Sequence, residues 1–147
     1  EPFFFITLQR SHHLTHCSLQ GNESLLQAPN LDSLPTAWDP VSSILGSLVN
    51  PGLIGVDLAD LKEVLAGKHG YLHPVERLAV YDLDKQLTCQ KLEPRAAFVV
   101  IEHNLSKITI GKIHELVGLF DDMFTERFFA VPIEPRQKDI VITVCYS

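Results

Sequence analysis

The sequence predicts a single α+β domain in which helices pack on a mixed sheet of three to four strands. Three stretches, 96–102, 128–133 and 140–146, are nearly continuous runs of β-branched, aromatic and other apolar residues, as in buried strands. Two more stretches, near 75–91 and 109–124, repeat apolar residues at the spacing of one helix face. A strand–helix–strand crossover with an adjoining hairpin is the arrangement that these elements favour.

This domain is expected to span 39–147, and the segment 1–38 before it to be irregular with one possible strand. That strand is predicted at 3–8, where aromatic and β-branched residues cluster as in buried strands. From 9 to 39 no hydrophobic period is sustained, and glycine and proline interrupt a stretch rich in serine, asparagine and glutamine. We therefore expect mostly loop there, with at most one short helix.

A small group of metal-ligand residue types lies in this segment: His12, His13, His16 and Cys17. Imidazole and thiolate together are a zinc ligand set. However, no second ligand pair follows at the spacing of a zinc finger, and Leu14-Thr15 does not favour a helix that would align the ligands. A solvated, histidine-rich loop is the stronger interpretation, and no metal site is predicted.

A short helix is predicted immediately after this segment. Asp39 is a suitable N-cap and Pro40 suits the first helical position, where a missing N–H costs nothing. The apolar residues that follow at helical spacing are Val41, Ile44, Leu45, Leu48 and Val49. Pro51 and Gly52 then end this helix.

The helix that starts near Val56 or Asp57 carries the candidate site. Its apolar face is formed by Val56, Leu61, Val64 and Leu65, whereas acidic residues recur on another face. Asp57 and Asp60 fall in the first turn, where carboxylates stabilise the positive end of the helix dipole. Capping of that helix is the simplest explanation of both residues.

The remaining elements follow from similar local signals. Glycines at 67 and 70 end the acidic helix, and His73-Pro74 is expected to open the helix near 75–91, which leaves a strand at 70–72 in doubt. Thr109 is a plausible N-cap for the helix at 109–124. Its expected buried stripe consists of Ile110, Ile113, Val117, Phe120 and Phe124.

Composition excludes several classes of function for this 147-residue chain. A net charge of −6 without a dense basic run argues against nucleic acid and against an acidic membrane surface. No apolar run approaches the roughly 20 residues of a transmembrane helix, and from the residues at the start of the sequence we expect no signal peptide. The three scattered cysteines do not suggest a disulfide framework, so we expect a cytoplasmic protein.

The stretch 50–65 resembles the loop and helix that join the two domains of the FtsZ/tubulin superfamily, where bacterial members read close to P-G-L-I/M-N-V-D-F-A-D-V-K-T-V-M. The matching residues are Pro51, Gly52, Leu53, Ile54, Val56, Asp57, Ala59, Asp60, Lys62 and Val64. Leu58 replaces the family phenylalanine, and Gly55 replaces the loop asparagine. The runs at 129–135 and 140–144 also resemble F-G-A-V-I-D-P and I-x-V-T-V of the FtsZ C-terminal domain. The resemblance covers about 39–146, with 40–49 as a shortened central helix.

This resemblance implies a role in a polymerising, cell-division type of cytoskeletal GTPase. In the family, the loop equivalent to 50–60 enters the nucleotide pocket of the next subunit of a protofilament. Asp57 and Asp60 would be the catalytic residues, positioning the water that attacks the γ-phosphate of GTP, with Mg, bound by that neighbouring subunit. Self-association, or contact with another FtsZ/tubulin-like subunit, is the implied partnership.

The chain has no glycine-rich loop of the kind that wraps nucleotide phosphates. We therefore predict that it binds no GTP alone and is inactive alone, as half of a larger protein or as a stand-alone module. An alternative is a non-catalytic interaction module that caps or regulates an FtsZ/tubulin-like polymer. A third interpretation, a ferredoxin-like sensing or metal-binding domain, depends only on the histidine group at 12–17.

Overall fold

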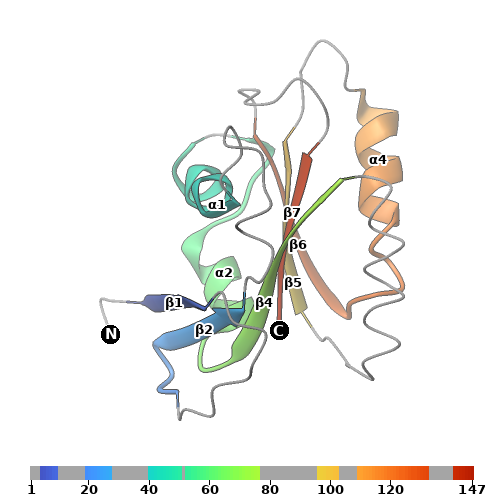
Figure 1. Cartoon of the computed structure of the whole chain (residues 1–147). Helices are drawn as coiled ribbons and strands as arrows, with labels where there is room; N and C mark the ends of the chain where they lie inside the picture. Colours follow the sequence, from blue (N-terminus) through green and yellow to red (C-terminus); the bar gives the residue numbers. More distant parts are fainter. Residues whose placement is uncertain are drawn as a thin grey trace.

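The structure is a computed structural model, and it describes residues 4–9, 19–27, 40–50, 52–76, 96–102, 109–132 and 141–147. One seven-stranded mixed sheet runs through the molecule in the order β1-β2-β4-β7-β5-β6-β3 (Figure 1). The strands are β1 Phe5–Gln9, β2 Glu23–Gln27, β3 Gly52–Ile54, β4 His69–Glu76, β5 Ala96–Glu102, β6 Glu126–Pro132 and β7 Val141–Tyr146.

The sheet changes strand direction around its centre. β1, β2 and β4 are parallel neighbours, and β5 is parallel to β6. Between these two parallel groups, β7 runs antiparallel to both β4 and β5. At the far edge, the short β3 pairs antiparallel with β6.

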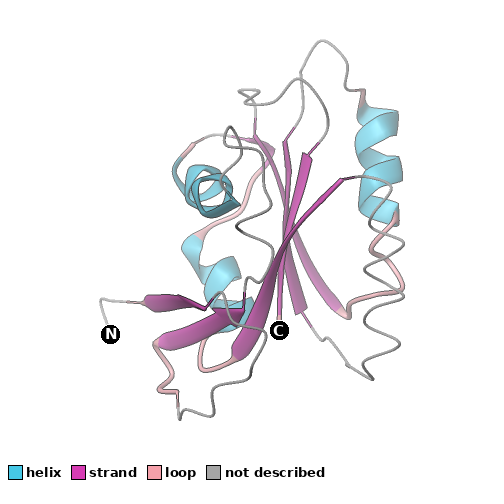
Figure 2. Ribbon diagram, viewed as in Figure 1, coloured by secondary structure: helices cyan, strands magenta, loops and turns pink. Residues whose placement is uncertain are grey.

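Helices cover both faces of the sheet (Figure 2). Helices α1 (Pro40–Val49) and α2 (Leu58–Leu65) lie on one face, and α4 (Ile110–Gly118) lies on the other. Because side chains alternate along a strand, β5 and β7 send apolar residues into both layers. All seven residues of β5 are buried, which explains why its sequence is continuously apolar rather than alternating.

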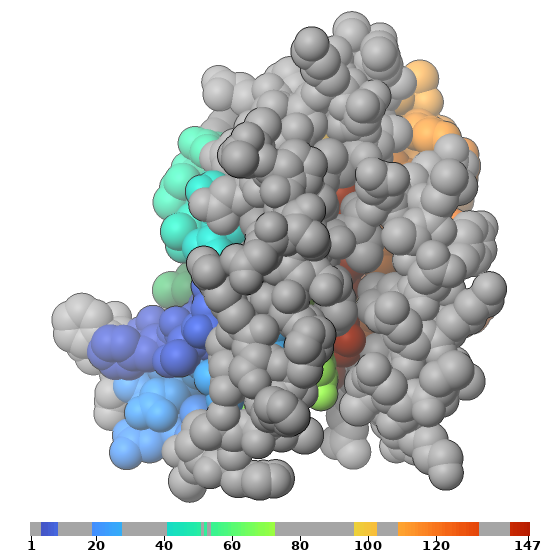
Figure 3. Space-filling view, in the orientation of Figure 1, coloured from blue at the N-terminus to red at the C-terminus, as the bar shows by residue number. Residues whose placement is uncertain are grey.

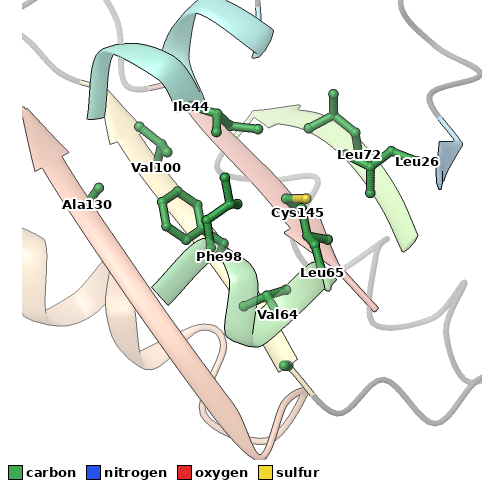
Figure 4. Close-up of a cluster of buried hydrophobic side chains, with 11 residues drawn as sticks. Leu26, Ile44, Val64, Leu65, Leu72, Phe98, Val100, Ala130 and Cys145 are labelled. Atoms are coloured by element: carbon green, nitrogen blue, oxygen red, sulfur yellow. The ribbon is translucent and has the colours of Figure 1, made fainter. Parts of the chain in front are cut away.

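Each face has its own hydrophobic cluster. The cluster under α4 combines Leu116, Phe120 and Phe124 with Val99, Ile101, Val144 and other residues of the sheet. The cluster under α1 and α2 contains Leu26, Ile44, Leu61, Val64, Leu65, Leu72, Ala96, Phe98, Val100, Ala130 and Cys145 (Figure 4). Phe98, from the middle of β5, is fully buried there.

The predicted α+β class with a mixed sheet is confirmed, but the sheet is larger than the expected three or four strands. Two of the additional strands, β1 and β2, come from the segment 1–38, where one strand was expected. β1 has the predicted composition, yet Phe5 is 56% exposed and Ile6 38% exposed, because the strand lies at the sheet edge. The domain division at residue 38 stays a prediction.

Two local predictions are wrong. Residues 73–76 continue strand β4 and do not open a helix, because they pair along β7 from His73↔Val144 to Glu76↔Val141; the rest of the predicted helix, from 77 on, lies outside the described residues. The expected hairpin between 128–133 and 140–146 does not form either. β7 is inserted between β4 and β5, where its apolar residues are buried on both faces.

The helix predicted at 109–124 is confirmed in position, with Thr109 as its N-cap, but α4 ends at Gly118 and turns follow. Ile110 is 87% exposed rather than part of the buried stripe. Leu116, which the prediction omitted, is fully buried instead. The apolar residue nearest the cap is therefore on the solvent side of α4, and the buried contact of the helix is made one to two turns later.

Buried ionisable groups in the sheet make stability depend on alkaline pH. Burial raises the pKa of the Cys145 thiol to about 12. The pKa of Tyr146 is also raised, first by burial and then by neighbouring Tyr71 and Cys145. Both groups ionise more readily in the unfolded chain than in the folded one. Their stabilising contribution to the free energy of unfolding is therefore complete below about pH 8.5, and it is lost as the pH rises toward the pKa values of the folded state.

We therefore expect the free energy of unfolding, measured with urea, to fall steadily from about pH 8.5 to 11. In a variant with Cys145→Ala and Tyr146→Phe, the stability should be lower at pH 7 but should change less across that interval. An equal slope in the variant and the parent chain would contradict this assignment.

Candidate functional site

The predicted loop 50–60 connects α1 to α2 at one edge of the sheet. β3 within it pairs antiparallel with β6, with Gly52 opposite Pro132 and Ile54 opposite Val131. The register shifts between Gly52 and Ile54, as at a β-bulge. The loop is therefore fixed to the sheet along its first part, and α2 begins only a few residues later.

Gly52 is required by the close backbone contacts of this loop. A Cβ at Gly52 would lie 2.6 Å from the carbonyl oxygen of Ile54 and 2.9 Å from that of Val131. Gly55, by contrast, has nothing within 4 Å of the position where a Cβ would be. Close packing of the backbone therefore requires glycine at position 52 but not at position 55.

This contrast gives a direct test of the loop geometry. We expect Gly52→Ala to destabilise the chain by about 1–3 kcal/mol, because backbone atoms must move to admit a methyl group. Gly55→Ala is the matched control, and its effect should stay within about 0.5 kcal/mol. Urea unfolding of both variants measures the difference, and equal stabilities would contradict the described contact.

Asp57 and Asp60 form a reciprocal capping box at the start of α2. The backbone N–H of Asp60 donates to Asp57 Oδ1 over 2.9 Å, and the backbone N–H of Asp57 donates to Asp60 Oδ2 over 2.9 Å. Asp57 is the N-cap, with extended backbone at φ −129° and ψ 178°. The predicted helix start and the predicted capping by both residues are confirmed.

The capping bonds hold the two carboxylates in fixed orientations. Each uses one oxygen for the cap, and the second oxygens, Asp57 Oδ2 and Asp60 Oδ1, take no part in it. Asp57 is exposed and Asp60 is half-buried. Chemically, such a pair can accept hydrogen bonds from a water molecule or another donor that approaches the helix start from outside.

Exposed apolar side chains occur at the end of α1 and within the loop 50–60. Val49, the last residue of α1, is 79% exposed; Ile54 in β3 is 39% exposed, and Leu58, the first residue of α2, is 48% exposed. Leu45, one helical turn before Val49, is 57% exposed. We call these four residues and the two aspartates the loop surface; α1, which contributes to it, reaches the exterior in Figure 3.

Other residues considered from the sequence are not part of this surface. His114 is exposed on α4, on the opposite face of the sheet, and Cys145 is a buried free thiol in the core. The histidine group at 12–17, His103 and Cys89 lie outside the described residues. Within the described ranges, no three His, Cys, Asp or Glu residues are grouped to hold a metal ion.

One polar pair in the described structure was missed by the sequence prediction. Glu102, at the end of β5, is only 2% exposed and accepts a hydrogen bond from the Ser43 hydroxyl of α1. A possible signal was present: a single carboxylate ends the apolar run 96–102, on a strand expected to be buried. Its partner could not be identified without the tertiary fold.

Comparison with known proteins was informative only at the level of structure. No protein-family model matches the chain, and no curated protein matches it. CetZ from Methanosaeta thermophila strain DSM 6194 superposes with a TM-score of 0.57 at 16% identity, over 85% of this chain. The empty FtsZ dimer of M. jannaschii gives 0.55 at 13% identity over 83% of this chain, and a mutant of that FtsZ gives 0.52 at 16% identity over 83%.

The chain has the FtsZ-like fold. The predicted likeness to the FtsZ/tubulin C-terminal domain is thus confirmed at the level of structure. The chain spans less than half of these proteins, matching 42% of CetZ and 44% and 45% of the two FtsZ chains. None of its described helices has both the length and the hydropathy to cross a membrane.

Proposed function

We propose that the FtsZ-like chain is the C-terminal, GTPase-activating and protofilament-contact domain of a cytoplasmic cytoskeletal GTPase of the cell-division type. The loop surface contacts a neighbouring FtsZ/tubulin-like subunit. Asp57 and Asp60 act in trans on the GTP, with Mg, held by that subunit. The sequence resemblance of 50–65 and the fold likeness motivate this proposal.

The capping box is the observation that carries it. Two carboxylates are held at an exposed helix start by reciprocal 2.9 Å hydrogen bonds, with one oxygen of each left outside the cap. Groups fixed before the substrate arrives need little reorganisation during the reaction, which is the main source of electrostatic catalysis. The same bonds that stabilise α2 therefore also prepare a pair of acceptors.

These acceptors suit the role of a water-positioning group in phosphoryl transfer. The oxygens outside the cap would accept hydrogen bonds from the attacking water and align it with the γ-phosphate. As the water loses its proton, a nearby carboxylate can take it up. The nucleotide phosphates and their metal would be held entirely by the neighbouring subunit.

The apolar residues of the loop surface support a protein contact at the same place. Val49 and Leu58 are exposed apolar residues that stand immediately before and after residues 50–57 in the sequence. Burying such residues against a partner excludes water and brings the carboxylates close to the partner's site. One matched structure is described as an FtsZ dimer, and self-association of this chain is proposed by analogy with it.

The first experiment is nucleotide binding by the isolated chain. We expect no saturable binding of GTP, with or without Mg²⁺, in titration calorimetry, because the chain has no glycine-rich phosphate loop. The chain fused behind the GTP-binding domain of an FtsZ protein is the positive control and should bind. Saturable binding by the isolated chain would overturn the proposed division of labour.

A non-catalytic module that caps or regulates an FtsZ/tubulin-like polymer is the second candidate. It is favoured by Gly55, which offers no amide side chain where the family carries asparagine, and by the cap, which alone explains both aspartates. A Cβ atom at Gly55 would meet nothing within 4 Å, so no packing constraint on the Cβ requires glycine there. Turnover in the fusion separates the two candidates, since a non-catalytic module gives no stimulation.

A further inference from the structure

Helix α1 has an unusual distribution of residues between its two sides. Ile44 is buried, and Val41 and Leu48 pack half-buried against the same cluster. The other buried residues are small or polar, namely Ser43, Gly46 and Ser47, whereas Leu45 and Val49 are exposed. A helix that packs on a sheet normally turns its large apolar residues inward. The contact of α1 with the sheet therefore depends on more than apolar packing.

The inward polar residues have different partners. The Ser43 hydroxyl donates to Glu102 Oε1 on β5, across the interface between helix and sheet. The Ser47 hydroxyl donates 2.6 Å to the carbonyl oxygen of Ile44 within α1 itself. Ser43 therefore connects the helix to the sheet, whereas Ser47, on the same helix and almost as buried, does not.

Glu102, which accepts the hydrogen bond from α1, is a buried residue on an interior strand of the sheet. It is 2% exposed and ends β5, a central strand of the sheet. The neighbouring strand β7 is buried here as well: Thr143 is 1% exposed and pairs with Val100, two residues before Glu102 on β5. A buried carboxyl group is unfavourable without hydrogen bonds, so the bond from Ser43 stabilises the position of α1 in which its hydroxyl reaches Glu102.

We propose that Ser43 and Glu102 are positioning residues that fix α1 on the sheet and thereby place the loop that carries Asp57 and Asp60. The ten-residue helix leads directly into this loop, and the rise of about 1.5 Å per residue places Ser43 about 9 Å from Val49 at the end of the helix. A hydrogen-bonded helix moves as a rigid body, so displacement at Ser43 is carried to Asn50 and β3. The inference rests on the proposed function only for its consequence for GTP turnover.

Hydrogen exchange of the isolated full chain tests this placement without any nucleotide. In Ser43→Ala, the amides of Gly52, Ile54, Asp57 and Asp60 should exchange about fivefold to tenfold faster, the size expected from losing one buried hydrogen bond. Ser47→Ala is the matched control and should leave these amides unchanged. Ser43→Thr, which keeps the hydroxyl, should restore slow exchange.

The outcomes separate positioning from general stability. Equal exchange at these amides in Ser43→Ala and Ser47→Ala would overturn the proposal, as would faster exchange over the whole sheet in Ser43→Ala alone. If Ser43→Ala does not fold, Glu102→Met, which keeps a similar volume but removes the acceptor of the Ser43 hydroxyl, replaces it. Its loop amides should exchange faster than those of the parent chain, and unchanged exchange would overturn the proposal.

A second readout connects the proposal to the site. In the GTPase fusion, Ser43→Ala should lower kcat with little change in KM, because nucleotide binding belongs to the neighbouring subunit. If exchange of the loop amides rises but neither Ser43→Ala nor the aspartate variants change turnover, the positioning role stands and the proposed function fails. Unchanged exchange together with a turnover loss in the aspartate variants would overturn the positioning role and leave the proposed function intact.

Discussion

Asp57→Ala and Asp60→Ala are each expected to lower GTP turnover in the fusion by about two to four orders of magnitude, the range for loss of a positioned acid–base group. In the isolated chain, the same changes remove only a cap. Loss of a capping residue costs about 1 kcal/mol, which shifts the melting temperature of a domain of this size by about 2–4 °C. Turnover and thermal unfolding, measured on both variants, reveal the two effects separately.

Glu63→Ala is the control for this experiment. Glu63 is an exposed carboxylate on the same helix, but its side chain takes no part in the capping box. It should therefore leave both turnover and melting temperature nearly unchanged. If turnover is the same in the parent fusion and in both aspartate variants, capping is the whole role of Asp57 and Asp60.

The two aspartates should also fail to behave independently in stability measurements. Each carboxylate accepts the backbone N–H of the other residue, so one substitution disturbs the environment of the other. The double variant is therefore expected to lose less stability than the sum of the single losses. That non-additivity distinguishes a reciprocal cap from two separate surface carboxylates.

Phe98→Ala is expected to destabilise the chain strongly, by about 3–5 kcal/mol. Phe98 is fully buried in the middle of β5, a strand that lies between β7 and β6 in the sheet. Its ring belongs to the hydrophobic cluster under α1 and α2. Removing its ring opens a cavity that the paired strands cannot close, because their backbone positions are fixed by the ladder. Urea unfolding at neutral pH measures the loss.

The matched control is Phe5→Ala on the edge strand β1. Phe5 is 56% exposed, so the same substitution removes little buried area and should cost well under half as much. Similar losses at both positions would show that β1 contributes to the core as strongly as β5 does. Such a result would contradict the burial described for the two strands.

The parts of the fold that sequence reasoning predicted correctly are those in which local signals and tertiary packing agree. Strand β5 was placed at its observed bounds because a run buried on both faces is apolar throughout. The starts of α1, α2 and α4 were located by Pro40, Asp57 and Thr109, residues that satisfy or avoid unpaired N–H groups.

The errors occurred where tertiary pairing overrides local signals. His73-Pro74 looks like a helix start, yet these residues pair along β7 from His73 to Glu76. β6 and β7 are consecutive apolar strands with a turn-like segment between them, which indicates a hairpin, but β7 gains more burial between β4 and β5. Neither the pairing of 73–76 with β7 nor the position of β7 between β4 and β5 is determined by the local sequence at those strands.

The site was predictable as a pair of residues but not as a geometry. The spacing of Asp57 and Asp60 indicated a helix start, and the capping box was found there. The exposed apolar neighbours Val49 and Leu58 resemble core residues in the sequence, because a helical period does not say which side faces the sheet. The Ser43–Glu102 contact joins residues distant in the chain and requires the fold to be known.

The central place of β7 has a consequence for how this chain folds. β4 ends at Glu76 and β7 begins at Val141, yet the two strands are neighbours along their length. Pairing β7 with β4 closes the long chain segment between them, and the conformational entropy of that segment must be lost before the sheet can be completed. Until residues 141–146 insert, β4 and β5 have unpaired edges and their two halves of the sheet remain separate, so refolding is expected to be slow and aggregation to compete during this interval.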